Sequence, residues 1–175
     1  MKIRELSRPH LFLDMDGVQS DFFGAWAEHH NVPSYKDIPD PEAAIDLLAS
    51  TGYDNVYRFF AELKPLSGGI RIIHWLKMHH VSFTVLSAPL RGQEAASIHG
   101  KKDWLDKYNP GTSEHALFDN NKAKYATKNG QPHVLVDDFG KYLTAWDAAG
   151  GIAVKHTEET ADQTIEMLEK IYGIR

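Results

Sequence analysis

The amino-acid sequence predicts an α/β fold in which helices cover both faces of a parallel sheet and a small helical cap follows the first strand. Short apolar segments alternate along the chain with longer segments of helical periodicity, which is the pattern of strands joined by helical crossovers. The interval between the first two apolar segments exceeds sixty residues, whereas a crossover with its helix needs only about a dozen. The long interval therefore predicts an insertion.

Five segments are expected to form the strands, because each is short, almost free of charge and followed by polar or glycine residues. Continuous apolar strands of this kind are typical of a parallel sheet that is covered on both faces. They comprise residues 10–13, 81–86, 116–118, 133–136 and 152–154.

Four further segments carry apolar side chains at three- and four-residue spacing, which predicts amphipathic helices. Their alternation with the strands predicts right-handed crossovers. Trp75, Trp104 and Trp146 lie at these apolar positions and are expected in the core. The helical segments comprise residues 69–79, 95–108, a helix around 142–146, and 160–172.

The inserted segment is expected to be a cap over one edge of the sheet. Residues 18–64 are mostly helical in pattern and are interrupted by three prolines and by Gly52. We therefore predict two domains, a core made of residues 1–17 and 65–175 and a small helical cap made of residues 18–64.

The composition restricts the class of protein. A chain of 175 residues is long enough for one core with a small insertion. It has no cysteine, which excludes disulfides and thiolate chemistry, and its net charge of −5 argues against a surface for long nucleic acid. No apolar run approaches the roughly 18 residues of a membrane helix, and the N-terminal segment lacks the apolar core of a signal peptide. We expect a soluble, cytoplasmic protein.

Polar side chains cluster where the predicted strands end. Because the carboxyl ends of parallel strands meet at one edge of the sheet, we expect these side chains to lie close together. Several carboxylates at such short range oppose one another's ionisation unless a cation joins them, and an oxygen-rich site of this kind suits Mg²⁺, often together with phosphate. The side chains are Asp14 and Asp16, Ser87, Lys122, and Asp137 with Asp138.

These residues resemble a known family. Asp14-Met15-Asp16-Gly17-Val18 is similar to the first motif of the haloacid dehalogenase-type phosphatases, and Ser87 fits the hydroxyl of the second motif. Lys122 or Lys124 fits the lysine of the third motif, and Asp137-Asp138 fits the acidic fourth motif. The resemblance covers most of the chain. It implies a Rossmann-like three-layer sheet and hydrolysis of a phosphate monoester through an aspartyl-phosphate.

The resemblance also implies a role for each residue. Asp14 would be the nucleophile, and Asp16 would protonate the leaving oxygen and then activate water. Gly17 would allow a sharp turn that leaves amide groups open to the phosphoryl oxygens. Ser87 and Lys122 would hold the remaining phosphoryl oxygens.

The resemblance places Mg²⁺ on the Asp14 side chain, the Asp16 backbone carbonyl and the Asp137-Asp138 pair, without ranking the two members of the pair. Lys122 is preferred as the third-motif lysine because it stands at an expected helix start. Lys124, two residues further on, would face away from the site if Lys122 faces it, and it is kept as the second candidate for a substrate contact.

Within the family, the chain looks most similar to the 5′(3′)-deoxyribonucleotidase group, which implies a nucleoside monophosphate as substrate. In that group the residue that matches Phe22 packs against the nucleobase, and aromatic faces do stack on bases. Two positions depart from the group, which usually has Leu at Gln19 and a second hydroxyl at Ala88, a position next to the phosphate. The matching segments are 14–22, 59–68, 87–90, 102–105 and 134–138.

Alternative functions remain open on the sequence. The substrate could be a phosphosugar or another small metabolite, or the chain could be a non-catalytic binding module with the same fold. A role in processing nucleic-acid ends is disfavoured by the net charge. Phe22 taken alone is more typical of a core position than of a base contact. The oligomeric state is also open, a homodimer included.

Overall fold

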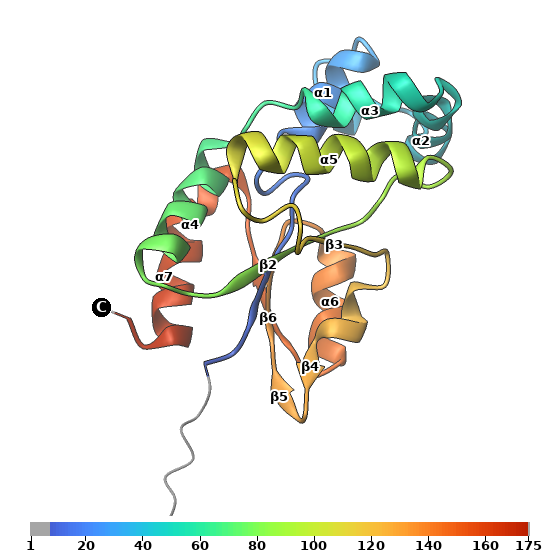
Figure 1. Cartoon of the computed structure of the whole chain (residues 1–175). Helices are drawn as coiled ribbons and strands as arrows, with labels where there is room; N and C mark the ends of the chain where they lie inside the picture. The colour runs from blue at the N-terminus through green and yellow to red at the C-terminus, as the bar shows by residue number, and fades with distance from the viewer. Residues whose placement is uncertain (1–7, 175) are drawn as a thin grey trace, which may run out of the picture.

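The computed structural model of the chain describes residues 8–174, and its main feature is a five-stranded parallel sheet (Figure 1). The strand order is β3-β2-β1-β6-β7, so the first strand lies in the middle. All neighbours in this sheet pair in parallel, which confirms the predicted α/β fold class. The strands are β1 (Leu11–Leu13), β2 (Phe83–Ser87), β3 (Leu117–Phe118), β6 (Val134–Asp137) and β7 (Ile152–Lys155).

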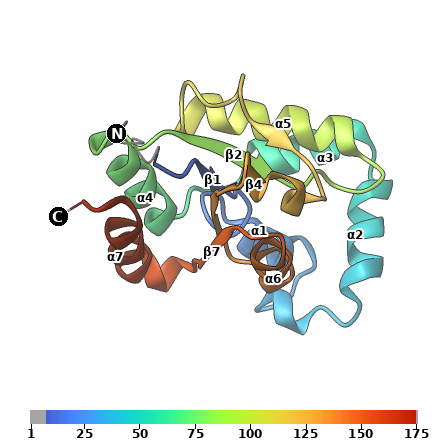
Figure 2. The ribbon, with the colours of Figure 1, turned by 90° about the horizontal axis from the view of Figure 1, so that it is seen from below.

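Helices cover both faces of this sheet because successive strand residues point to opposite sides. Leu11 and Leu13 of β1 belong to one hydrophobic cluster with α4 (Ser67–Met78) and α7 (Ala161–Tyr172). Phe12, between them, belongs to another cluster with α6 (Gly140–Ala148). Figure 2 shows α4 and α7 together on one side of the strands and α6 on the other. The three layers of the prediction are therefore present.

Three helices and a short 3-10 helix lie between β1 and α4. Asp21 and Asp40 start two of the helices, since each side chain accepts a hydrogen bond from the backbone of the first turn. Pro41 follows Asp40 at the first helical position, where proline is favoured. The elements are α1 (Phe22–His29), η1 (Tyr35–Asp37), α2 (Pro41–Ser50) and α3 (Tyr53–Ala61).

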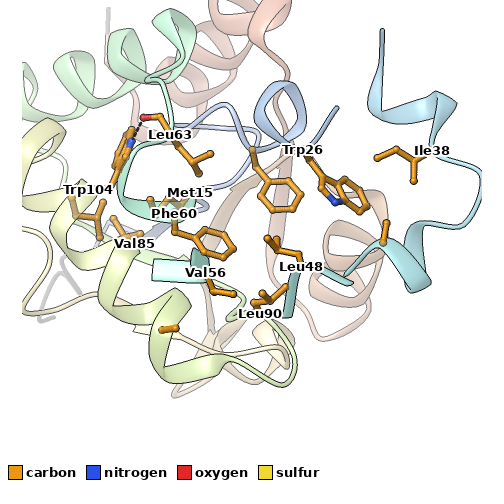
Figure 3. Packing of buried hydrophobic residues seen from close by; sticks show 14 residues of the cluster. Met15, Trp26, Ile38, Leu48, Val56, Phe60, Leu63, Val85, Leu90 and Trp104 are labelled. Atoms are coloured by element: carbon orange, nitrogen blue, oxygen red, sulfur yellow. Dashed lines mark hydrogen bonds between the residues drawn. The ribbon is translucent and has the colours of Figure 1, made fainter. Parts of the chain in front are cut away.

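These helices share a hydrophobic cluster with α5 (Glu94–Tyr108), which lies alongside α3 (Figure 1). Gly100 allows the close approach, because a Cβ atom there would lie 2.3 Å from the Tyr57 carbonyl oxygen of α3. Figure 3 shows Trp26 and Phe60 packed in this cluster near Leu48 and Leu90, with the Trp104 indole nitrogen donating to the Leu63 carbonyl at 2.8 Å. The helices of residues 22–61 are thus anchored to the sheet layer by continuous packing.

A short antiparallel hairpin was not predicted. It consists of β4 (Thr127–Lys128) and β5 (Gln131–Pro132), and it projects from the sheet before β6 (Figure 1). Asn129 and Gly130 at its tip both have positive φ angles, the geometry that an Asn-Gly hairpin turn requires. The remaining short elements are η2 (Lys122–Tyr125) and η3 (Glu158–Thr160). Among residues 8–174, no helix has the length and apolar character needed to span a bilayer.

Candidate active site

A pocket of about 480 Å³ opens at the carboxyl ends of the strands. Its polar end is lined by residues that follow β1, β2 and β6 and by the first residue of η2. Its other walls come from α1, α2 and α3 and from the segment after β6. The residues at the polar end that the sequence had singled out are Asp14, Asp16, Ala88, Lys122 and Asp138.

Lys122 joins two carboxylates at this end of the pocket. Its Nζ donates to Asp14 Oδ1 at 2.6 Å and to Asp137 Oδ2 at 2.7 Å, and all three side chains are almost fully buried. Burial alone would lower the pKa of Lys122, but the charges of Asp14 and Asp137 outweigh it and hold the pKa above its ordinary value. Lys122 is therefore a permanent cation beside Asp14, and no acceptor within residues 8–174 takes its third N–H group.

Three carboxylates nevertheless exceed what one lysine can neutralise. Oxygen atoms of Asp14, Asp137 and Asp138 lie within 4.8 Å of one another. Burial, followed by the charge of Asp137, raises the pKa of Asp14 well above its usual range and that of Asp138 to about 7. The donor set consists of hard oxygen atoms, so it fits Mg²⁺ in chemistry and would exchange this repulsion for coordination.

Asp16 has a lysine of its own, which the sequence analysis missed. Lys101 in α5 is fully buried, and its Nζ donates to Asp16 Oδ2 at 2.7 Å, to Ser87 Oγ at 2.9 Å and to the Ala88 carbonyl at 2.6 Å. All three donors are used, so Lys101 holds the Asp16 side chain. A signal was present, because Lys101 lies on the buried face of its helix between Ser97 and Trp104.

This contact gives Ser87 a structural partner that the sequence did not predict. Ser87 is fully buried and lies outside the lining of the pocket, where its hydroxyl accepts a hydrogen bond from Lys101. It therefore helps to fix Lys101, and its expected contact with a phosphoryl oxygen stays a prediction. Ala88, the next residue, does line the pocket, and its carbonyl is directed to Lys101.

Gly17 makes the turn that directly follows Asp16. Its φ angle is +78°, and a Cβ atom would lie 2.5 Å from Asp138 Oδ2, so no other residue fits without rearrangement. The N–H of Gly17 itself donates to the Ser20 carbonyl at 2.8 Å, and the expected contact of amide groups in this turn with phosphoryl oxygens stays a prediction. Gly17 thus shapes the loop and lets Asp138 approach it.

Lys124 lies outside this pocket. Its ammonium pairs with Asp119, and its side chain is about half exposed on another surface that includes His10 and Lys128. In a 3-10 helix a step of two residues turns the side chain by roughly two thirds of a turn, which separates Lys124 from Lys122. The structure therefore does not support the expected substrate contact of Lys124.

Aromatic side chains form much of the remaining wall of the pocket. Phe22, Phe23, Trp26, Tyr35 and Phe60 line the pocket from residues 22–61, and several pack ring against ring. Phe22 is only 8% exposed, so it belongs both to the hydrophobic cluster and to the pocket wall.

The chain segment after β6 contributes two further aromatic rings to the pocket wall. Tyr142 and the half-exposed Phe139 line the pocket there, and the two rings lie 5.5 Å apart. At the mouth, Arg91 pairs with Glu42 at 3.0 Å and with Asp46 at 2.9 Å. The pocket therefore combines one charged end with a largely aromatic interior.

No protein-family model matches the sequence, and no curated protein sequence gives a significant match. Solved structures do match. A hydrolase of the haloacid dehalogenase family from Deinococcus radiodurans, with phosphate and sodium bound, has a TM-score of 0.52 at 15% identity, over 95% of this chain and 96% of that one.

Two further structures give similar values. A protein provisionally described as a β-phosphoglucomutase from Thermotoga maritima has a TM-score of 0.51 at 14% identity, over 93% of this chain and 99% of that one. A hydrolase of family IA, variant 3, from Entamoeba histolytica has a TM-score of 0.50 at 12% identity, over 94% of this chain and 90% of that one. The chain therefore has the fold of the haloacid dehalogenase-type hydrolases.

Proposed function

We propose that the protein is a Mg²⁺-dependent phosphatase that hydrolyses a small phosphate monoester through an aspartyl-phosphate on Asp14. The observation that carries this proposal is that two carboxylates, Asp14 and Asp16, open into one pocket and each is held by its own buried lysine. A structural ion pair would not need two such carboxylates side by side at a pocket floor.

In the first step, a carboxylate oxygen of Asp14 attacks phosphorus while the bond from phosphorus to the leaving oxygen breaks. Lys122 holds the other carboxylate oxygen at 2.6 Å, so the attacking group is fixed in direction. Asp16, in its protonated form, gives its proton to the leaving oxygen, and the alcohol departs.

In the second step, water attacks the phosphorus of the aspartyl-phosphate and Asp16 accepts a proton from it. The Asp14 carboxylate and inorganic phosphate are released, so both residues return to their starting states. Lys101 keeps Asp16 in one position during both transfers, because its three hydrogen bonds fix the ammonium on the Ser87 and Ala88 side. The unused N–H of Lys122 is available to a phosphoryl oxygen.

Mg²⁺ would be held by the carboxylates of Asp14, Asp137 and Asp138 together with the Asp16 carbonyl, and it would neutralise charge on the phosphoryl group.

We infer that the organic part of the substrate is a nucleoside. The aromatic wall supports this, since bases stack on aromatic faces and the volume is within the usual range for small-molecule sites. A phosphosugar is the alternative, but it would find few polar partners on that wall. We further propose that residues 18–64 act as a cap that excludes bulk water from the reaction.

The first experiment measures phosphate release from deoxy- and ribonucleoside monophosphates and from sugar phosphates, with Mg²⁺ or with EDTA. We expect Mg²⁺-dependent release that is lost in Asp14→Asn and is fastest on nucleotides. A matched control is Asp119→Asn, since Asp119 lies after β3 but pairs with Lys124 outside the pocket. Release from no monoester would refute the phosphatase proposal and favour a binding module. A clear preference for sugar phosphates would refute the nucleoside inference alone.

The covalent step has a separate test. With an aryl phosphate, whose leaving group needs no protonation, Asp16→Asn should still form the aspartyl-phosphate but hydrolyse it slowly. Intact mass spectrometry after rapid acid quenching should then show one added phosphoryl group. If the added mass persists in an Asp14→Asn background, the nucleophile is a different residue.

A further inference from the structure

A chain of buried amides lies directly behind Asp14. Gln19 is fully buried, and its Nε2 donates to the Asp14 carbonyl at 2.8 Å. Its Oε1 accepts a hydrogen bond from Asn109 Nδ2 at 3.0 Å, and Asn109 is fully buried as well. The backbone carbonyl of Asp14 is thus connected through two side chains to the C-terminal end of α5.

The direction of every bond in this chain follows from its first member. A carbonyl oxygen can only accept, so the NH₂ group of Gln19 must face Asp14 and its oxygen must face Asn109. Asn109 must in turn present its NH₂ group, and its Oδ1 is left buried without a partner within residues 8–174. An unpaired buried acceptor costs stability, which a pair of apolar side chains would avoid.

Asn109 is tied to α5, whose Lys101 already holds the other carboxylate. The backbone N–H of Asn109 closes the last turn of α5 by donating to the Leu105 carbonyl at 2.8 Å. Lys101 lies about two turns earlier in the same helix. α5 therefore meets the loop of residues 14–20 at two points, one behind Asp14 and one at the Asp16 side chain.

The same loop is fixed on its other side. A Cβ atom at Gly69 in α4 would lie 2.0 Å from the Val18 carbonyl oxygen, so this helix packs directly against the loop. The amides of Gln19 and Ser20 both donate to the Met15 carbonyl, which closes the loop on itself. The Asp14 N–H donates to the Val136 carbonyl at 2.9 Å, and the Asp14 carbonyl is connected to the end of α5 through the side chains of Gln19 and Asn109.

We propose that Gln19 and Asn109 are positioning residues, which set the Asp14 peptide against α5 and thereby keep the Asp14 and Asp16 carboxylates in register with each other. The proposal rests on the phosphatase function proposed above. It accounts for a fully buried polar pair that keeps an unpaired acceptor.

The test compares Gln19→Leu, Asn109→Leu and the double variant. Gln19→Leu leaves Asn109 Nδ2 unpaired in addition to its oxygen, so it should unfold at lower urea concentration than wild type. The double variant removes both side-chain amides and should recover part of that loss. If the pair positions Asp14, kcat should still fall about 10- to 100-fold in all three variants, with KM little changed. The effects should not add, because the two residues act as one unit.

The control is Thr164→Val, which removes a buried, hydrogen-bonded hydroxyl from α7, outside the pocket lining. It should lose stability without losing kcat. A double variant whose kcat returns together with its stability would overturn the proposal, since the pair would then serve packing alone. Absence of turnover in wild type would instead refute the phosphatase function on which the proposal rests, so the two failures are distinct.

Discussion

Replacing Lys101 by Met is the most direct test of the site, because Met keeps an unbranched chain up to the Cε position and removes the ammonium with its charge and three donors. The change leaves Asp16 without its counterion, and Ser87 Oγ and the Ala88 carbonyl without their donor. It also removes an ammonium placed 4.8 Å from the centroid of the Phe60 ring.

Breaking a buried ion pair by removing one partner costs about 3–5 kcal/mol of folding free energy. The Asp16 side chain is 22% exposed, so water recovers part of this cost, and Met avoids the desolvation of a buried ammonium. We therefore expect a loss of about 2–4 kcal/mol, which for a chain of this size lowers Tm by roughly 10 °C. Because Asp16 also loses its fixed position, kcat should fall by a factor of about 10²–10³.

Urea unfolding and steady-state phosphate release measure the two effects. Lys102→Met is the matched control, because Lys102 is the adjacent residue in α5 and forms no ion pair within residues 8–174. It should change neither quantity measurably. A Lys101→Met protein with wild-type kcat would refute the view that Lys101 holds the acid–base residue, whatever its stability.

Three further predictions concern charge and pH. Since the pKa of Asp138 is raised to about 7 from 3.8, its ionisation destabilises the metal-free fold as pH rises from about 4 to 7. Asp138→Asn should therefore raise the urea midpoint at pH 8 in EDTA. Adding Mg²⁺ should stabilise the variant protein less than it stabilises the wild-type protein. Burial lowers the pKa of His156 in the folded chain. As pH falls, His156 is therefore protonated in the unfolded chain before it is protonated in the folded chain, and stability is lost below pH 6.5. His156→Gln should reduce the drop in urea midpoint between pH 7.5 and 5.5, and the exposed His74→Gln should not. Arg91→Ala breaks only exposed ion pairs, so its urea midpoint should equal that of wild type at any salt concentration.

The carboxylate end of the site was predictable because it depends on local rules. Asp14 directly follows the apolar strand β1, and Asp137 is the last residue of the apolar strand β6. Parallel pairing brings the carboxyl ends of these two strands together. Lys122 was found for a similar reason, since it follows β3 by only a few residues. The Asn129-Gly130 hairpin carried an equally local signal, which the sequence analysis did not use.

Lys101 and Asn109 were not predictable in this way. Lys101 lies in α5 and Asn109 caps it, and they are 85 and 90 residues along the chain from the residues of the 14–20 loop that they bind. Whether they reach the loop of residues 14–20 depends on how closely α5 and α3 pack, which is set by Gly100 and by the aromatic cluster around Phe60. Side-chain periodicity shows that Lys101 is on the buried face of α5, but not which element it meets.

The packing of α5 also explains how the aromatic wall and the carboxylates keep a fixed spacing. α5 holds Asp16 through Lys101 and the Asp14 peptide through Asn109 and Gln19. On its other side it packs against α3, which carries Phe60 into the pocket wall. A shift of α5 would move Asp16, the Asp14 peptide and Phe60 together. A shift of α3 alone is opposed by its close contact with Gly100 of α5. The position of Phe60 relative to the two carboxylates therefore depends on how α5 packs.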